Sequence, residues 1–191
     1  MKTLIISDIH IGRKDSNVSK LADFIKNTPS DRIILNGDIF DQFALWKDKG
    51  RLYRNEHKIH VKNIYKILKE RETEIIYLAG NHDYLTLLLI PFGFLFGITI
   101  RKRWSEPTFM VEHGDWISFY LTIRRLFLIN RSIKLKSYVE NCILFAKIKD
   151  KFLIVGHSHK PGNFHTVYDE GDWVEHNTCL ILEDKQPKYE S

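Results

Sequence analysis

Residues 3–10, Thr-Leu-Ile-Ile-Ser-Asp-Ile-His, join a short apolar run to a motif of acidic and imidazole side chains. A continuous run such as Leu4-Ile5-Ile6 is typical of a strand that is covered on both faces of its sheet. Asp8 and His10 are two residues apart, so they project from the same side of an extended backbone. The stretch therefore predicts a buried strand that presents two potential metal ligands at its carboxyl end.

The same combination recurs along the chain. Apolar runs that indicate strands lie at residues 32–35, 74–78 and 152–155, with a shorter candidate at 109–111. The polar motifs that follow these runs are GDIFD at 37–41, GNHD at 80–83, GHSH at 156–159 and HGD at 113–115. Polar side chains at the carboxyl ends of neighbouring strands converge in space, and open α/β sheets place their sites there. The motifs are therefore expected to form one site.

The candidate ligands are Asp, Asn and His side chains, and neither Cys142 nor Cys179 lies in a motif. Oxygen and imidazole donors without thiolates suit Mn, Fe or Zn, and they argue against an iron–sulfur cluster or a structural thiolate site. The candidates are too many for one ion: Asp8, His10, Asp38, Asn81, His113, His157 and His159. Two ions that share a carboxylate use them all, and such a pair clamps the attacking and leaving oxygens of a phosphoryl displacement.

This ordered set of motifs resembles the calcineurin-like metallophosphoesterase superfamily, whose pattern is DxH, GDxxD, GNHD, a later histidine and GHxH. Every element of that pattern is present and in order between Asp8 and His159. Within the superfamily, residues 35–38, 113–115 and 156–161 are most similar to UDP-2,3-diacylglucosamine hydrolase and its bacterial and archaeal relatives. That enzyme usually has Arg where this chain has His82, and Glu where this chain has Asp41.

The resemblance implies an α/β fold: a four-layer α-β-β-α sandwich of two mixed sheets flanked by helices, in a single domain over residues 1–191. It also implies two divalent metal ions, with Mn²⁺ expected and Fe, Zn or Ni as alternatives. By the same resemblance a hydroxide that bridges the metals is the nucleophile. The implied ligands of the first metal are Asp8, His10, Asp38 and His159, and those of the second are Asp38, Asn81, His113 and His157.

Four further polar residues of the motifs are candidates for supporting roles. Next to the metals, His82 can hydrogen-bond a phosphate oxygen or protonate the leaving group, and Asp83 is expected to orient its imidazole. The alternative for His82 is a packed structural histidine. Asp41 either orients a histidine ring or caps the next helix. Asp115 is a candidate partner for His113.

The resemblance implies a metal-dependent phosphoesterase that hydrolyses a phosphodiester or pyrophosphate bond, with a UDP-lipid-type pyrophosphate as one such substrate. A phosphomonoesterase, including a phosphoprotein phosphatase, shares the same ligands and stays an alternative. A nuclease is favoured by the basic segment within residues 117–151, but the small size of the chain and the lack of a separate DNA-binding domain oppose it. A non-catalytic metal-binding scaffold is disfavoured, because no ligand of the pattern has been lost.

The composition fits one globular domain with a substantial core. The chain has 191 residues, of which 43% are hydrophobic and 28% charged, and its net charge is +5; these values are ordinary for soluble proteins. The first residues enter a strand directly, without the basic, apolar and cleavage regions of a signal peptide. Two cysteines outside every motif indicate no disulfide framework. We therefore expect a cytoplasmic protein, of an oligomeric state that the sequence does not define.

Two segments leave alternatives open. Residues 84–100 are uncharged and rich in Leu, Ile and Phe, but Pro91 and two glycines interrupt them, so they do not span a membrane. A core helix that ends near Pro91 is favoured, and the alternative is an exposed acyl-chain groove or membrane-facing patch. Residues 117–150 are a candidate helical cap. The eight basic residues between 117 and 151 form either a solvated helix face or an anion-attracting rim.

A helix, a strand and a frayed end are also expected outside the motifs. Apolar residues at helical spacing predict a helix over 55–71, with His57 and His60 on its surface. Residues 173–177 are expected to form a strand, and residues 186–191 to fray.

Overall fold

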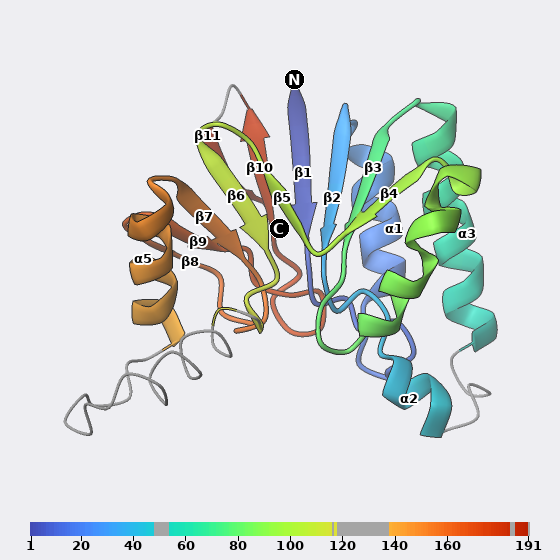
Figure 1. The fold of residues 1–191 in the computed structure, drawn as a ribbon. Helices are drawn as coiled ribbons and strands as arrows, with labels where there is room; N and C mark the ends of the chain where they lie inside the picture. Colours follow the sequence, from blue (N-terminus) through green and yellow to red (C-terminus); the bar gives the residue numbers. More distant parts are fainter. Residues whose placement is uncertain (48–53, 116, 118–137, 184–185, 191) are drawn as a thin grey trace.

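Two β-sheets pack face to face and are flanked by helices (Figure 1). The computed structural model describes residues 1–191 except 48–53, 116, 118–137, 184–185 and 191. The first sheet contains β1 (Lys2–Ile6), β2 (Arg32–Asn36), β3 (Glu74–Leu78), β4 (Ile98–Arg101), β10 (Cys179–Glu183) and β11 (Gln186–Glu190), in the order β11-β10-β1-β2-β3-β4. The second contains β5 (Arg103–Ser105), β6 (Phe109–Glu112), β7 (Phe152–Val155), β8 (Gly162–Phe164) and β9 (Val167–Asp169), in the order β5-β6-β7-β9-β8.

Both sheets are mixed, as the resemblance implied. Strands β1 to β4 are parallel to one another, whereas β10 is antiparallel to β1 and to β11. In the second sheet β6, β7 and β9 are parallel, and β5 and β8 are antiparallel edge strands. The five apolar runs predicted as strands correspond to β1, β2, β3, β6 and β7, so those predictions are confirmed. Parallel pairing places the carboxyl ends of these strands at a common edge of each sheet.

The core occupies both faces of the first sheet, because side chains alternate between the faces of a strand. One set of alternate residues packs between the two sheets; it includes Ile5, Ile34, Ile76, Val111 and Ile154. The intervening residues pack against helices α1 (Val18–Asn27) and α3 (Arg54–Glu70); they include Leu4, Ile33 and Ile75. The continuous apolar runs of the sequence thus reflect strands that are buried on both sides.

Helix α5 (Tyr138–Lys149) forms the fourth layer. Its residues Cys142, Phe145 and Ala146 pack against Leu153 and Val155 on the outer face of β7. The arrangement of α1 and α3, first sheet, second sheet and α5 confirms the predicted four-layer sandwich (Figure 1). The end of the 117–150 segment is therefore a layer of the sandwich and not part of a cap. Most of the rest of that segment lies outside the described residues, so a cap there, and the role of its basic residues, stay predictions.

Residues 84–96 differ from the favoured expectation. They form η1 (Tyr84–Phe96), a 3-10 helix that lies between β4 and α3 (Figure 1), and many of its large apolar side chains are exposed. Pro91 inside this segment lacks a backbone donor and cannot continue a regular α-helix. Gly97, in the left-handed region at φ 64°, ends η1 before β4. The prediction of a core helix is wrong, because these side chains are exposed. An acyl-chain groove or a membrane-facing patch stays a prediction. None of the helices among the described residues is long and apolar enough to cross a bilayer.

Two predictions about the C-terminal part are also wrong. Residues 173–176 form a turn and not a strand, because the Asp172 carboxylate accepts the backbone N–H groups of Val174 (2.7 Å) and Glu175 (2.5 Å). Residues 186–190 do not fray but form β11, which pairs with β10. The Tyr189 hydroxyl donates to the carbonyl of Asp169 (3.0 Å) and thereby binds β11 to the second sheet.

The helix predicted over 55–71 is α3, confirmed to within one residue at each end. His57 does not lie on its surface as expected. The side chain is buried, and its Nδ1 atom accepts the backbone N–H of Gly12 at 3.2 Å. This contact connects α3 to the loop that carries the first motif.

Candidate metal centre

The five motif loops meet at one edge of the two sheets, the lower edge in Figure 1. The first two loops are joined by backbone hydrogen bonds from Asp8 N to the Gly37 carbonyl (3.1 Å) and from His10 N to the Asp38 carbonyl (2.9 Å). The loop after β7 joins them, because Asp8 Oδ2 accepts the backbone N–H of His157 at 2.9 Å. Motifs that lie far apart in the chain are thus in direct contact.

Asp8, His10 and His159 form a first group of potential ligands. Their ligand atoms all lie within 4.8 Å of one another. His159 Nε2 is 3.2 Å from Asp8 Oδ1, and His10 Nε2 is 3.4 Å from His159 Nε2. Asp8 and His10 are buried, whereas His159 is partly exposed. The group therefore has a closed side formed by the β1 loop and an open side formed by the β7 loop.

Asp38, His113 and His157 form a second group of the same size. His113 Nε2 lies 3.2 Å from Asp38 Oδ2. The two groups are adjacent, since His10 Nε2 lies 4.0 Å from the same Asp38 oxygen. Asp38, a member of the second group, thus lies next to the first, and it forms a third group with His10 and His82.

Asn81 is the one predicted ligand outside these two groups, and its side chain is exposed. Its loop is nevertheless bound to the centre, because Asp38 Oδ1 accepts the backbone N–H of His82 at 2.8 Å. The role of Asn81 as a ligand stays a prediction.

Five of the predicted ligands have left-handed backbones. The φ angles are 51° for Asp8, 51° for His10, 52° for Asp38, 71° for His157 and 56° for His159. Non-glycine residues rarely adopt this region, and such strain clusters at functional sites. The backbone of the motif loops therefore turns the side chains inward at an energetic cost that the surrounding fold must offset.

Two motif glycines permit the close approach of the loops. A Cβ atom on Gly80 would overlap Asp38 Oδ1, and one on Gly156 would lie 2.6 Å from Asp8 Oδ2. Only glycine leaves room for a carboxylate at these positions. These two glycines are therefore part of the site geometry.

Asp41 fulfils both of the roles that the sequence left open. Its Oδ2 atom lies 3.2 Å from His82 Nδ1 and 3.7 Å from His10 Nδ1. Its Oδ1 atom accepts the backbone N–H of Ala44 (2.7 Å) in the first turn of α2 (Gln42–Lys47). Asp41 thus caps a helix and at the same time lies within ion-pair distance of two imidazoles, beside which it can orient the His82 ring.

Asp83 was expected to orient His82, and the structure corrects this. The Asp83 carboxylate is fully buried and accepts the backbone N–H groups of Gly80 (2.7 Å) and Ile39 (2.8 Å). It also accepts the Tyr77 hydroxyl at 2.5 Å. Asp83 therefore binds the loop after β2 to the loop after β3, and the carboxylate beside the His82 ring is that of Asp41.

Asp115 likewise has a different partner from the one expected. It pairs with Lys102 Nζ at 3.0 Å. His113 is oriented instead by the backbone, because its Nδ1 atom lies 2.9 Å from the carbonyl oxygen of Asn36. An Nδ1–H donated to that carbonyl leaves Nε2 to bind a cation beside Asp38.

Sequence reasoning missed two buried acids behind the centre, Asp169 and Glu170. Asp169 Oδ2 accepts the hydroxyl of Ser158, in the last motif, at 2.6 Å. Glu170 Oε1 accepts the amide of Asn36 at 2.9 Å. A signal for both was present, because Asp169 is the last residue of β9 and Glu170 follows it, much as the motifs stand at the ends of their strands. Burial raises the pKa of Asp169 to about 7 and that of Glu170 to about 8.

The electrostatics of the centre are set by close carboxylates and imidazoles. Burial alone would raise the pKa of Asp8, but the charge of His113 and the nearby imidazoles of His10 and His159 lower it well below its usual range. Burial would lower the pKa of His113, but the negative charges of Asp8 and Asp38 raise it to about 10. The carboxylates thus attract positive charge, which either protons or metal ions can supply.

The residues present fit divalent cations. Among the described residues, the buried atoms Asp8 Oδ1 and His113 Nε2 have no hydrogen-bond partner. Each lies within ion-pair distance of a neighbour, His159 and Asp38 respectively, but outside hydrogen-bond geometry. Unpaired buried polar atoms are costly, and a cation bound to them removes that cost. The donor set of carboxylate and imidazole suits Mn, Fe or Zn.

The sequence shows the family to which the chain belongs. A family model for the calcineurin-like phosphoesterases matches residues 1–176. The chain therefore belongs to the calcineurin-like phosphoesterase family, and it is a metal-dependent phosphoesterase. The family implies divalent metal ions and a phosphate-ester substrate. A comparison with curated protein sequences finds no match.

Several solved structures share the fold over nearly their whole length. An archaeal phosphodiesterase is 18% identical with a TM-score of 0.54, and the match covers 100% of this chain and 98% of that one. A single mutant of Vps29 from Entamoeba histolytica is 15% identical with a TM-score of 0.52, covering 100% and 97%. A protein from Thermus thermophilus is 13% identical with a TM-score of 0.53, covering 100% and 98%. At these identities the likeness shows the fold alone, and it agrees with the predicted sandwich.

Proposed function

We propose that the protein is a two-metal-ion phosphohydrolase that cleaves a phosphodiester or pyrophosphate bond. The observation that carries this proposal is the pair of ligand groups, which are adjacent at Asp38 and His10. One group supplies Asp8, His10 and His159 to a first ion, and the other supplies His113 and His157 to a second. Asp38 belongs to the second group and lies beside the first through His10, with which it forms a third group that also contains His82. In this proposal Asp38 is shared by the two ions, and Asn81 completes the ligands of the second. Mn²⁺ is the expected ion, with Fe, Zn and Ni as alternatives.

When bound, two such ions lower the pKa of a water molecule and offset the charge that grows on the phosphoryl oxygens. The chain supplies the rest of the chemistry. The Asn36 carbonyl lies 2.9 Å from His113 Nδ1 and fixes that ring, and the Asp41 carboxylate lies 3.7 Å from His10 Nδ1. Fixed ligands need no reorganisation during the reaction, which is the main benefit of a preorganised site.

His82 is the proton donor in this proposal. Its ring is partly exposed, stands at right angles to the His10 ring with centroids 4.8 Å apart, and is held by Asp41 at its Nδ1 atom. Nε2 is then the atom that faces a substrate and gives a hydrogen bond or a proton to the leaving group. A positioned general acid contributes about 10²–10⁴-fold in rate.

Hydrolysis of bis(p-nitrophenyl) phosphate and p-nitrophenyl phosphate with Mn²⁺ tests the proposal. We expect preference for the diester, and loss of activity in Asp38→Asn and His82→Ala. Asp23→Asn, on the exposed side of α1, and His60→Ala, on α3, are matched controls that should retain activity. Preference for the monoester would instead assign a phosphomonoesterase, and unchanged turnover in Asp38→Asn would contradict the two-ion mechanism.

A positive diester result leads to pyrophosphate substrates. UDP-linked lipids are the first to test, on the resemblance of the motifs to UDP-2,3-diacylglucosamine hydrolase. Single-stranded and duplex DNA serve as the comparison, with binding measured over a range of salt concentrations. Hydrolysis of DNA in preference to the nucleotide-linked lipid would assign a nuclease and contradict the pyrophosphate proposal.

A further inference from the structure

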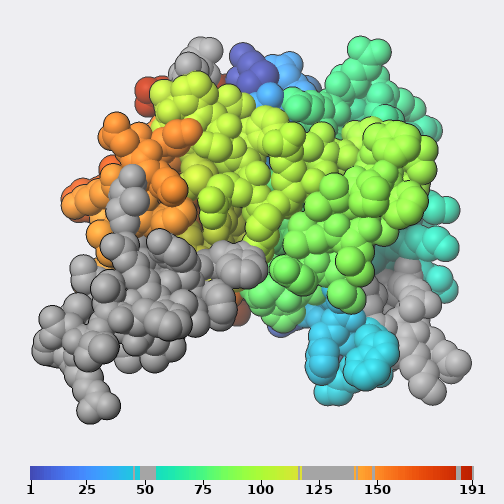
Figure 2. Space-filling view, viewed as in Figure 1, coloured from blue at the N-terminus to red at the C-terminus, as the bar shows by residue number. Residues whose placement is uncertain are grey.

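Helices α2 and η1, which follow two of the motifs of the metal centre, both expose large apolar side chains, and their joint surface is called the α2–η1 surface. Trp46, Leu88 and Phe94 are 77%, 71% and 75% exposed. The two helices are connected, because the backbone N–H of Leu85 is 3.3 Å from the side-chain oxygen of Gln42. In Figure 2 the green atoms of η1 lie on the right part of the front, beside the yellow-green atoms of the strands that follow, and the cyan atoms of α2 lie below them. Exposed apolar surfaces of this kind mark interaction sites.

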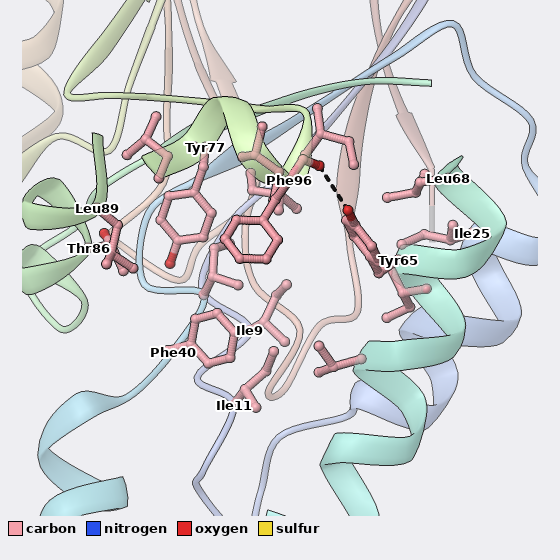
Figure 3. Close-up of a pocket in the computed structure, with 18 of the residues that line it drawn as sticks. Ile9, Ile11, Ile25, Phe40, Tyr65, Leu68, Tyr77, Thr86, Leu89 and Phe96 are labelled. Atoms are coloured by element: carbon pink, nitrogen blue, oxygen red, sulfur yellow. Dashed lines mark hydrogen bonds between the residues drawn. The ribbon is translucent and has the colours of Figure 1, made fainter. Parts of the chain in front are cut away.

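A cavity of about 260 Å³ lies beneath this surface, between η1, α3, α1 and the first sheet (Figure 3). Leu89, Phe92 and Phe96 of η1 line the side of the cavity that η1 covers, and Tyr65 lines the side formed by α3. The Tyr65 hydroxyl donates to the carbonyl of Phe96 (2.8 Å), which attaches the end of η1 to α3. The lining is apolar, so the space under η1 can accept further apolar atoms without leaving a polar group unpaired.

A row of lysines borders the apolar surface. Helix α3 carries exposed lysines at spacings of four, four and three residues, which places them on one side of the helix; they are Lys58, Lys62, Lys66 and Lys69. Lys69 Nζ lies next to Gly97 at the end of η1, 2.6 Å from where a Cβ would be. The other side of α3 faces α1, where Arg71 donates to the carbonyl of Ile25 at 2.8 Å. The lysine row therefore lies on the η1 side of α3.

We propose that the α2–η1 surface docks on a lipid bilayer that carries anionic headgroups. Apolar side chains of η1 and the Trp46 ring enter the headgroup–acyl boundary, and the lysine row contacts the headgroups. An uncharged apolar segment bordered by lysines has the composition that binds anionic membrane interfaces. Tryptophan is favoured at that depth because its ring is amphipathic.

The bordering charge distinguishes a bilayer from the other occupants of an apolar face. Lysine is depleted in protein–protein interfaces, whereas here it lines the surface. A second copy of this chain would bring its own lysine row and its own net charge of +5 to the same contact. A bilayer with anionic lipids is complementary both to the exposed apolar side chains and to the lysine row.

Docking in this way places the metal centre close to the membrane. The η1 helix begins at Tyr84, two residues after His82, and α2 begins one residue after Asp41. The proposal concerns the location of the protein and does not rest on the bond that it cleaves.

Vesicle co-sedimentation of the full chain tests the proposal. We expect binding to vesicles of phosphatidylcholine mixed with phosphatidylglycerol, weaker binding to phosphatidylcholine alone, and a decrease with added salt. Leu88→Glu should reduce binding at least tenfold. Lys58→Gln and Lys62→Gln should each reduce it roughly fivefold at low salt, the effect of one lysine near an anionic surface.

Leu144→Glu is the matched control, because Leu144 is an exposed leucine on α5, on the opposite side of the sandwich. It should bind vesicles like the unmodified chain. Tryptophan emission gives a local readout: mixed vesicles should shift it to shorter wavelength, and Trp46→Phe should abolish most of that shift. Equal unfolding temperatures of Leu88→Glu and the unmodified chain show that folding is not the cause.

Three results would overturn the proposal. The first is no binding of the unmodified chain to mixed vesicles. The second is equal loss of binding in Leu88→Glu and Leu144→Glu. The third is a dimer in solution that Leu88→Glu dissociates while vesicle binding is absent, which would assign the surface to a second copy of the chain.

Discussion

The Oδ2 atom of Asp41 lies 3.2 Å from the Nδ1 atom of His82, and the other Asp41 oxygen caps α2 through Ala44 N at 2.7 Å. One carboxylate thus connects the proposed proton donor to the start of a helix. The connection makes the orientation of His82 depend on a residue three positions beyond the expected shared ligand Asp38.

Asp41→Asn should separate these two roles. Asparagine caps a helix as well as aspartate does, so the free energy of unfolding should change by less than about 0.5 kcal/mol. The charge beside His82 is lost, and kcat should fall about 10–100-fold, as for other residues that orient groups at metal sites. Urea unfolding and steady-state kinetics measure the two effects. A variant with unchanged kcat would show that Asp41 does not position His82.

Asp83→Ala should destabilise the fold, because it removes the acceptor of two buried backbone N–H groups and of Tyr77. Each unpaired buried group costs about 1–3 kcal/mol, so we expect a loss of roughly 2–5 kcal/mol. Tyr77→Phe removes only one of these bonds and should cost about 1 kcal/mol. Full stability of Asp83→Ala combined with lost activity would restore the catalytic role that the sequence first indicated.

Metal binding should release protons at pH 8. Burial opposes protonation of His113, but Asp8 and Asp38 raise its pKa to about 10, so the metal-free ring carries a proton at pH 8. A cation bound at Nε2 displaces that proton. Mn²⁺ titration in weak buffer with a pH indicator should therefore show proton release, and metal affinity should fall as the pH is lowered. Binding without proton release would contradict this assignment of His113.

Glu170 should make the metal-free protein less stable as the pH rises. Burial, opposed by Asn36 and reinforced by Asp169 and Asp8, raises its pKa from 4.5 to about 8. Between these values the folded chain retains a proton that the unfolded chain has lost. The free energy of unfolding therefore decreases with pH, by at most about 1.4 kcal/mol per pH unit for one group.

Denaturant unfolding in the presence of a chelator at several pH values measures this dependence. Glu170→Gln mimics the protonated acid and keeps the partner for Asn36, so it should flatten the curve between about pH 5 and 8. An identical slope in the variant would assign the dependence to other groups, of which Asp169, with a pKa of about 7, is the nearest.

The positions of the proposed ligands could be read from the sequence because each one follows an apolar run. A run such as 3–6 fixes a strand, the strand fixes where its loop emerges, and parallel pairing brings the loops together. Six of the seven predicted ligands lie in the two groups that this rule places at one edge. The four-layer fold follows from the same runs, since strands without alternation must be covered on both faces.

The partners of the supporting carboxylates could not be read in this way. Asp41 and Asp83 are both close to His82 in the sequence or the fold. Asp83 is taken up by the backbone N–H groups of Gly80 and Ile39, tertiary contacts that the sequence does not show, and Asp41 is the carboxylate beside the ring. The exposure of η1 could not be predicted either, because an apolar composition favours a buried segment. Pro91 prevents the regular α-helix that was expected to be buried. The strand at 186–190 forms because it pairs with β10. Its polar sequence has no apolar run from which that pairing could be predicted.

The number of metal ions per chain tests the central claim most directly. Protein saturated with Mn²⁺ and freed of excess ion should contain two ions per chain by elemental analysis. Asp38→Asn should retain at most one tightly bound ion, and Asp23→Asn should retain two. A single ion in the unmodified chain, or two equally tight ions in Asp38→Asn, would contradict a centre built on a shared Asp38.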